Sequence, residues 1–332
     1  KIKFKKKGYY YASHPYLPYT LTPNERTAER EKTNYALQKK EYFFPSLEVN
    51  SLGFLNGKRG NRNFKKKKSQ NSYVIGCVGN STTLNYIEYK KKIYSYPLIL
   101  ETLLRKKYKR KKIFVNNFGV GLYNSTDILI RFILQILDLK PDLVILYLGH
   151  NDHEAYLSEK FKDDYSHIRK NLAENLWRIN LTKKISKLKI KSLTFLIQHI
   201  LGTNLRNTLN NFISTKNINY KTNHKNKMKT FARNVATLIK ICKSNNIKVI
   251  LSSYAYYLHK KIKKNPKYKK IQKIIKDENI IMKKISKETK TDFVDNQNLI
   301  EKNEKNFLDD QHFTPEGMQK LSENFLKKIR IN

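Results

Sequence analysis

Two segments at opposite ends of the chain carry residue types that suit nucleophilic catalysis. Ser81 follows the apolar run YVIGCVG and Asn80, so it stands where a strand-like segment ends. A serine hydroxyl is a weak nucleophile at its ordinary pKa, and it needs a histidine within hydrogen-bond reach and a third group that orients the ring. Taken alone, a serine at a strand end is more often a helix cap or a turn residue.

The segment FLDDQHFTPEGM, near the other end of the chain, supplies both partners. Asp309 and His312 are three residues apart, so one short turn can carry both and bring the carboxylate back to the imidazole. Thr314 and Pro315 are predicted to be the N-cap and the first residue of a terminal helix, which would fix this turn. Ser81, His312 and Asp309 therefore form a candidate catalytic triad.

The elements that must position these residues follow from the hydrophobic pattern. Short β-branched or aromatic runs predict five strands, at residues 73–79, 112–119, 142–149, 247–254 and 291–296. Helical patterns lie between them, including 95–108 with Ser95 as N-cap and 125–139 beginning at Ser125 or Thr126. This alternation predicts a parallel sheet that is covered by helices on both faces.

In such a sheet the functional site lies at the carboxyl ends of the strands. Polar residues follow three of the predicted strands at these ends: Gly79-Asn80-Ser81, Asn117-Phe118-Gly119 and Gly149-His150-Asn151-Asp152. We therefore expect the three segments to share one edge of the sheet with the candidate nucleophile.

These residues resemble the four signature blocks of the SGNH/GDSL esterases and lipases. The blocks are Gly79-Asn80-Ser81-Thr82-Thr83, NNFGVGLYNSTD with Gly119, Gly149-His150-Asn151-Asp152, and Asp309 to His312. Each block is weak alone, but the four occur in the family's order. The resemblance covers residues 73 to 329.

The resemblance implies a flavodoxin-like three-layer α/β/α fold with a central five-stranded parallel sheet. It also implies ester hydrolysis through an acyl-serine intermediate, with Ser81 as nucleophile, His312 as general base and then acid, and Asp309 as the orienting carboxylate. The oxyanion would be held by the backbone N–H groups of Ser81 and Gly119 and by the side-chain amide of Asn151. Gly79, Asn80, Gly149 and Asp152 would support this arrangement.

The chain departs from the family pattern at Asn80, where the family's name motif has aspartate. An asparagine can keep the local hydrogen bonds of the turn but carries no charge. Since the triad carboxylate is Asp309, we expect activity to survive this exchange and an Asn80→Asp variant to be tolerated.

Two regions fall outside the strand pattern: an N-terminal arm and an insertion within the core domain. Residues 1–71 are predicted to be an N-terminal arm and basic connector that pack on the core, and residues 72–332 the hydrolase domain. The arm, with HPYLPY and VNSLGF, is similar to one in a bacterial subgroup of the family. A helical, basic insertion is expected at about 153–228, and its segment 181–201 either lies on an anionic membrane or packs as a lid helix.

The formal net charge of +41 leaves a second class of function open. It suits binding to anionic polymers, although an AT-rich codon bias would produce the same mixture of Lys, Asn, Ile and Tyr. Scattered Lys, sparse Arg and the lack of a known motif argue against specific nucleic-acid recognition. The expected partner is a small-molecule, polysaccharide or lipid ester, which an esterase would hydrolyse. Two alternative functions remain: an O-acyltransferase that acts on envelope polysaccharide with the same triad, and a catalytically silent protein that binds anionic polymers.

Cofactor and compartment are less constrained. His150, Asp152 and His153 lie close together but fit no standard zinc pattern, so neither a metal nor a cofactor is expected. Cys77 and Cys242 are expected to be buried free thiols.

The sequence contains no run of about 18 apolar residues, the length that a membrane-spanning helix needs. Because the sequence starts at Lys1, a missing signal or anchor is an expectation, with the cell envelope or export favoured over the cytoplasm.

Overall fold

The computed structural model describes residues 11–12, 14–27, 30–33, 41–55, 72–168 and 218–331. The predicted amphipathic segment 181–201 and most of the insertion lie outside these ranges, and so does the basic connector that precedes residue 72. No helix in the described ranges is long and apolar enough to cross a membrane.

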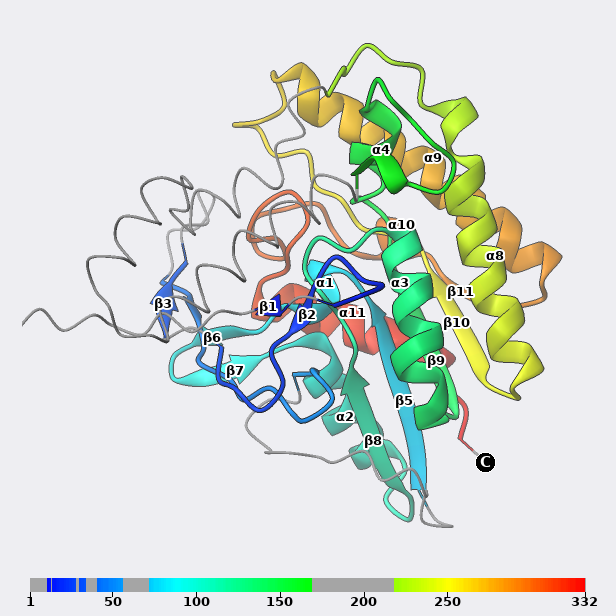
Figure 1. Ribbon diagram of the computed structural model, residues 1–332. Coiled ribbons are helices and arrows are strands. Elements are labelled where there is room, and N and C mark those ends of the chain that lie inside the picture. The colour runs from blue at the N-terminus through cyan, green and yellow to red at the C-terminus, as the bar shows by residue number, and fades with distance from the viewer. Residues whose placement is uncertain are drawn as a thin grey trace, which may run out of the picture.

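A five-stranded parallel sheet forms the centre of the molecule (Figure 1). Its strands are β5 (Ser72–Gly79), β8 (Lys112–Asn117), β9 (Leu143–Tyr147), β10 (Lys248–Ser252) and β11 (Asp292–Val294). They are arranged in the order β11-β10-β9-β5-β8, and every neighbouring pair is parallel. In chain order this is the 2-1-3-4-5 flavodoxin-like topology. The five predicted strands and their parallel arrangement are confirmed.

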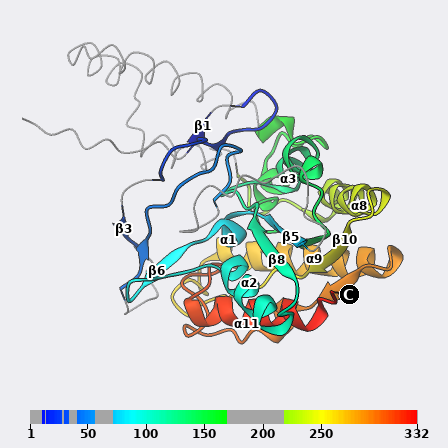
Figure 2. The same ribbon diagram turned by 90° about the horizontal axis from the view of Figure 1, so that it is seen from below.

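Helices cover both faces of the sheet (Figure 2). On one face lie α2 (Tyr96–Lys107) and α11 (Pro315–Lys328), which pack against each other. On the other face lie α3 (Ser125–Arg131) and α8 (Lys229–Ser244), and α9 (Pro266–Glu288) packs against α8. The predicted three-layer architecture is confirmed. Shorter helical segments are α1 (Ser81–Leu84), α4 (His153–Leu157), α10 (Asn296–Leu299) and the 3₁₀ turn Lys225–Lys227.

The three predicted helix starts agree with the structure. Ser95 accepts from the backbone N–H of Leu98, and Thr314 accepts from that of Gly317, so each caps its helix. Helix α3 begins at Ser125, as predicted, but the residue that caps it was not named from the sequence. Asn124 caps α3 and forms a capping box with Asp127, which satisfies two backbone donors at once.

The helix predicted over 125–139 is regular only in its first half. After α3 it continues as a π-helical turn, Phe132–Ile136, and a 3₁₀ turn, Leu137–Leu139. Lys140 then ends the segment in the left-handed region, with a φ of 47°. Hydrophobic periodicity locates such a segment but does not distinguish between these closely related helical conformations.

A second, antiparallel sheet joins the N-terminal arm to the core. Its order is β3 (Glu31–Lys32), β4 (Phe43–Phe44), β6 (Ile87–Tyr89) and β7 (Lys92–Tyr94). A separate antiparallel pair joins β1 (Tyr11–Ala12) and β2 (Thr20–Leu21). The β6–β7 hairpin was not predicted from the sequence. Lys90 and Lys91 both have positive φ in its turn, where glycine or asparagine is the usual signal.

The core lies between the sheet and its helices. Every residue of β9 is buried, which explains why Leu143–Tyr147 is a continuous apolar run without alternation. Cys77 and Cys242 are free and buried, as expected. Burial raises the pKa of both thiols, that of Cys242 to about 12, so both remain protonated at neutral pH.

Candidate active site

Ser81 is the first residue of a helix and does not cap it. Strand β5 ends at Gly79, and Asn80 is the N-cap of α1 because its Oδ1 accepts from the backbone N–H of Thr82 at 3.3 Å. The Ser81 hydroxyl is therefore not used as a cap, and the side chain is half-buried. The backbone N–H of Ser81 has no acceptor among the described residues, as expected for the first turn of a helix.

The structure brings Ser81, His312 and Asp309 together at the carboxyl end of the sheet. The Nε2 of His312 lies 3.1 Å from the Oγ of Ser81. The Nδ1 of the same ring lies 2.7 Å from Oδ2 of Asp309. This is the order of contacts in which the carboxylate fixes the tautomer and the free ring nitrogen faces the hydroxyl.

The turn that carries the carboxylate is held by its own backbone. Oδ1 of Asp309 accepts from the backbone N–H of Gln311 at 2.8 Å and from that of His312 at 2.6 Å. Directly afterwards Thr314 starts α11, which is packed on α2. Asp309 and His312 thus stand on a short rigid segment, as their spacing predicted.

The charges around His312 favour its protonated form. Burial by itself lowers the pKa of His312, but the Asp309 charge and hydrogen bond, with the Asp310 charge, outweigh it and raise the pKa above its ordinary value. Burial raises the pKa of Asp309, yet the His312 charge and the hydrogen bonds on the carboxylate lower it overall. Burial and the Asp309 charge raise the pKa of Asp310.

Asn151, the third predicted oxyanion donor, lies in the loop after β9. Its Nδ2 donates to the backbone carbonyl of Tyr123 at 3.0 Å, which uses one of the two amide hydrogens. Its Oδ1 lies 3.1 Å from Nδ1 of His150. Gly149 and His150 have φ values of 134° and 69°, so the chain turns sharply before Asn151.

Gly119 lies in the loop after β8 and packs directly on α1. A Cβ at this position would lie 2.2 Å from the backbone nitrogen of Leu84, so only glycine allows this approach. The Gly119 N–H donates to Oδ1 of Asn117 at 2.9 Å, and Nδ2 of Asn117 donates to the carbonyl of Thr83. In this structure the predicted oxyanion donor Gly119 is thus engaged within its own loop.

Two of the predicted supporting residues link neighbouring loops. Nδ2 of Asn80 donates to the backbone carbonyl of Gly149 at 2.7 Å. The carboxylate of Asp152 accepts from the backbone N–H and the hydroxyl of Ser125 and so ties the third loop to α3. Burial raises the pKa of Asp152 to about 6. These contacts fix the loops that surround Ser81.

The histidines beside Asp152 are packed without a metal-like arrangement. Burial lowers the pKa of His153 to about 3, so this ring is neutral, and its Nδ1 lies near the backbone carbonyl of His150. No cluster of three or more His, Cys, Asp or Glu side chains in the described ranges is placed to hold a metal ion.

The N-terminal arm also touches this edge, which the sequence did not specify. The Tyr19 hydroxyl donates to the carbonyl of Gly121 at 2.5 Å, and the Tyr123 hydroxyl donates to the carbonyl of Tyr19. A guanidinium nitrogen of the buried Arg131 donates to the carbonyl of Gly53 at 3.1 Å. The arm thus contacts the loop whose Tyr123 carbonyl accepts from Asn151.

Glu278 is a further residue at the site that sequence reasoning missed. It lies in α9, and its Oε2 accepts from the backbone N–H of His150 at 3.0 Å. A sequence signal exists: Glu278 falls at helical spacing with the buried residues Ile271, Ile274, Ile275 and Met282, so a charged residue occupies the apolar face of the helix.

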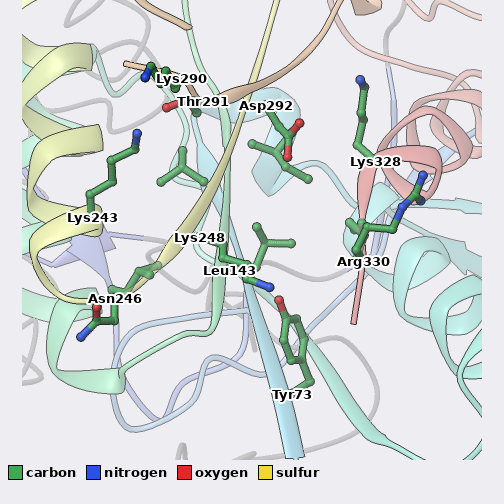
Figure 3. A pocket seen from close by; sticks show the side chains of 14 residues that line it. Tyr73, Leu143, Lys243, Asn246, Lys248, Lys290, Thr291, Asp292, Lys328 and Arg330 are labelled. Carbon is green, nitrogen blue, oxygen red and sulfur yellow. The ribbon is translucent and has the colours of Figure 1, made fainter. Parts of the chain in front are cut away.

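A basic cavity of about 490 Å³ lies at the opposite, amino edge of the sheet (Figure 3). Five cationic side chains line it. Lys243, Lys290 and Lys328 lie near the C-terminal ends of α8, α9 and α11, Arg330 follows α11, and Lys248 begins β10. Helix dipoles make these ends favourable for cations and unfavourable for anions. Three of these charges therefore lie where helix dipoles favour cations, and Ser81 does not line the cavity.

Sequence comparison decides the family. The sequence model of the GDSL-like lipase/acylhydrolase family matches residues 77–320, which include Ser81, Asn151 and the Asp309–His312 turn. The chain belongs to the GDSL-like lipase/acylhydrolase family. The four sequence blocks that resemble the SGNH/GDSL family all lie within the matched range, so this resemblance is confirmed.

Three solved structures with a similar fold are all distant in sequence. An acetylxylan esterase from Geobacillus stearothermophilus is 17% identical, with 80% of this chain and 97% of that chain covered and a TM-score of 0.47. A GDSL-like lipase from Bacteroides thetaiotaomicron is 16% identical, with 79% and 90% covered and a TM-score of 0.44. A lipase/acylhydrolase from Enterococcus faecalis is 17% identical, with 77% and 95% covered and a TM-score of 0.44. No curated protein matches the sequence.

Proposed function

We propose that this GDSL-like protein hydrolyses a carboxylic ester with Ser81 as nucleophile, His312 as general base and acid, and Asp309 as the orienting carboxylate. The observation that carries the proposal is the pair of contacts on one imidazole ring: 3.1 Å from Nε2 to the Ser81 hydroxyl and 2.7 Å from Nδ1 to Asp309. A serine cap or a surface histidine would need neither contact.

In the acylation half of the reaction, Oγ of Ser81 forms a bond to the carbonyl carbon of the ester while its proton passes to Nε2 of His312. The tetrahedral intermediate then breaks its bond to the alcohol oxygen, which takes that proton and leaves. In the second half, water gives a proton to Nε2 as it attacks the acyl-serine. Collapse then returns the proton to Ser81 and releases the acid. Asp309 stabilises the imidazolium in both halves.

Negative charge on the former carbonyl oxygen needs donors that are already in place. The Ser81 N–H has no acceptor among the described residues, and one Nδ2 hydrogen of Asn151 remains beside the one that binds the Tyr123 carbonyl. We assign these two as the first donors. The Gly119 N–H joins them only when it leaves Oδ1 of Asn117, so this residue stays a predicted donor.

The proposed substrate is an acyl ester, acetyl first, of a carbohydrate or a lipid. The Geobacillus neighbour, an acetylxylan esterase, makes acetylated xylan an obvious compound for a first panel. Acetylated sugars and acyl glycerides would be compared at equal concentration. Ester consumption with acid release marks hydrolysis, whereas acyl transfer to an added sugar hydroxyl marks an acyltransferase.

Labelling with a serine-reactive fluorophosphonate, read by intact mass, tests the nucleophile. The wild-type protein should gain one adduct, and Ser81→Ala should gain none. The matched control is Ser244→Ala, since Ser244 is an exposed serine at the end of α8, and this variant should label as the wild type does. A folded wild-type protein that takes no adduct would reject the proposal and favour a silent protein that binds anionic polymers.

A further inference from the structure

Glu278 is a glutamate with no exposed surface, in the interior of α9. It shares the buried face of this helix with Ile274, Ile275 and Met282. Burial of a carboxyl group is unfavourable unless its oxygens find hydrogen-bond donors. Burial of Glu278 therefore costs free energy that hydrogen-bond donors must offset. The donors that the carboxyl group has found indicate its role.

Both oxygens of the Glu278 carboxyl have partners near the candidate site. Oε2 accepts from the backbone N–H of His150 at 3.0 Å, and Oε1 accepts from the hydroxyl of Tyr156 at 3.2 Å. His150 directly precedes Asn151, and Tyr156 belongs to α4, which follows the same loop. One side chain from α9 thus holds the loop at its start and the helix at its end.

The 149–152 loop needs such a contact because its backbone conformation is energetically unfavourable. His150 has a φ of 69°, a left-handed conformation that side-chain-bearing residues rarely adopt and that persists only when the surroundings fix it. Gly149, before it, has a φ of 134°, and a Cβ there would lie 3.2 Å from Oε2 of Glu278. Glycine at 149 therefore leaves room for the carboxyl group as well as for the turn.

The remaining contacts of the loop show what the Glu278 contact adds. Asn80 donates to the Gly149 carbonyl at 2.7 Å, and Asn151 donates to the Tyr123 carbonyl at 3.0 Å. The loop is thus tied to α1 by one bond and to the 119–124 loop by the other. Glu278 supplies a third tie, from α9, and holds the Gly149–His150 peptide group, one residue before Asn151.

We infer that Glu278 is a positioning residue for ester hydrolysis, whose carboxyl group fixes the 149–152 loop so that the Asn151 amide faces the developing oxyanion. This inference rests on the proposed function, because it assigns Asn151 as an oxyanion donor. Glu278 touches neither substrate nor nucleophile, and it acts through the backbone of His150.

A purely structural role has a matched example in the same protein. Glu101 in α2 is also a buried glutamate, 3% exposed, and its Oε2 accepts from the backbone N–H of Val115 at 2.8 Å. Val115 lies within β8, before the loop that contains Gly119. Glu101→Ala should therefore weaken the fold in the same manner as Glu278→Ala without displacing a catalytic group.

The test compares kcat, KM and the thermal midpoint of Glu278→Ala, Glu278→Gln and Glu101→Ala on one ester, at a temperature where circular dichroism shows each protein folded. Glu278→Ala should lower kcat about 10- to 100-fold, less than the loss of a whole oxyanion donor, with KM changed less than about threefold. Glu278→Gln should stay within about threefold of wild type, because its amide oxygen still accepts from His150. Glu101→Ala should lose thermal stability and keep kcat within about twofold.

Equal kcat values for Glu278→Ala and Glu101→Ala would reduce Glu278 to a structural residue. If Glu278→Ala does not fold, Glu278→Met, which keeps the volume and removes the acceptor, carries the same expected loss of kcat. Ser81→Ala, measured alongside, separates the two proposals. If it retains the wild-type rate the proposed function fails, whereas an inactive Ser81→Ala with an unaffected Glu278→Ala overturns the present inference alone.

Discussion

The hydroxyl of Tyr123 donates a hydrogen bond to the backbone carbonyl of Tyr19, although 104 residues separate them in the chain. The two rings also contact each other, with centroids 5.5 Å apart. Tyr123 is at the same time the residue whose carbonyl accepts from the Asn151 amide. The arm is therefore connected to the candidate oxyanion donor through a single residue.

Removing this hydroxyl should weaken the fold. Tyr123→Phe leaves a buried carbonyl of Tyr19 without its donor, which we expect to lower the free energy of unfolding by about 1–3 kcal/mol. Urea unfolding measures the effect. The control is Tyr73→Phe, because the buried Tyr73 hydroxyl has no partner among the described residues and its loss should be neutral or stabilising. Equal losses in both variants would contradict the assignment.

Asp309→Asn should separate orientation from charge in the triad. The amide can keep a contact with Nδ1 of His312 but favours the wrong tautomer, so kcat should fall by about 10⁴-fold while KM changes little. Steady-state kinetics at saturating ester provide the measurement. Asp292→Asn, an exposed carboxylate at the opposite edge of the sheet, is the control and should leave kcat unchanged.

The pH dependence of kcat/KM should report His312. The general base must be neutral, so activity should rise with pH, and its inflection should lie above about 6.5 because the Asp309 and Asp310 charges raise the His312 pKa despite burial. Asp310→Asn removes one of these charges and should move the inflection to lower pH. An unchanged inflection in this variant would show that Asp310 does not act on His312.

The stability of the protein should depend on the ionisation of Glu278. Burial, followed by the Asp152 charge, raises the Glu278 pKa well above its ordinary value of about 4.3, so the folded protein keeps a proton that the unfolded chain releases. Stability from this group is therefore present below pH 4.3 and is lost as the pH rises towards the raised pKa. Glu278→Gln does not ionise, so urea unfolding between about pH 5 and pH 8 should show it gaining stability relative to wild type as the pH rises.

The structure changes the expectation for Asn80→Asp. Oδ1 of Asn80 makes the cap contacts that a carboxylate can also make, but Nδ2 donates to the Gly149 carbonyl at 2.7 Å, and a carboxylate cannot donate there. We now expect a loss of about 1–3 kcal/mol in the free energy of unfolding at neutral pH. Because an acid can donate once protonated, the loss should shrink as the pH falls. A pH-independent effect would contradict this explanation.

The strands and the turn that carries Asp309 and His312 could be predicted because they depend on local patterns. Continuous apolar runs such as 143–147 are typical of strands buried on both faces, and the three-residue spacing of Asp309 and His312 reflects a single turn. Asn124 was missed as a cap because Ser125 and Thr126 beside it have similar capping preferences, and only the capping box with Asp127 decides between them.

The contacts that the N-terminal arm and α9 make with distant segments could not be predicted. The pairing of Phe43 in β4 with Glu88 in β6, and the position of Tyr19 over Gly121, depend on how the arm folds back across the core. Glu278 carried a signal, a charge on the apolar face of a helix, but its partner is a backbone N–H from another layer. A single sequence can show that a charged residue lies on an apolar helix face. It cannot show which backbone group binds that residue.

The contact between Ser81 and His312 joins segments 231 residues apart. On the proposed mechanism, ester cleavage cannot begin until the first central strand and the turn before the last helix have met, so turnover is a late signal of self-assembly. In refolding from urea, circular dichroism should therefore recover ahead of, or together with, hydrolysis, and never after it. A lag between the recovery of circular dichroism and the recovery of hydrolysis would measure the time that α11 takes to dock. Enzyme activity would then report the final step of folding.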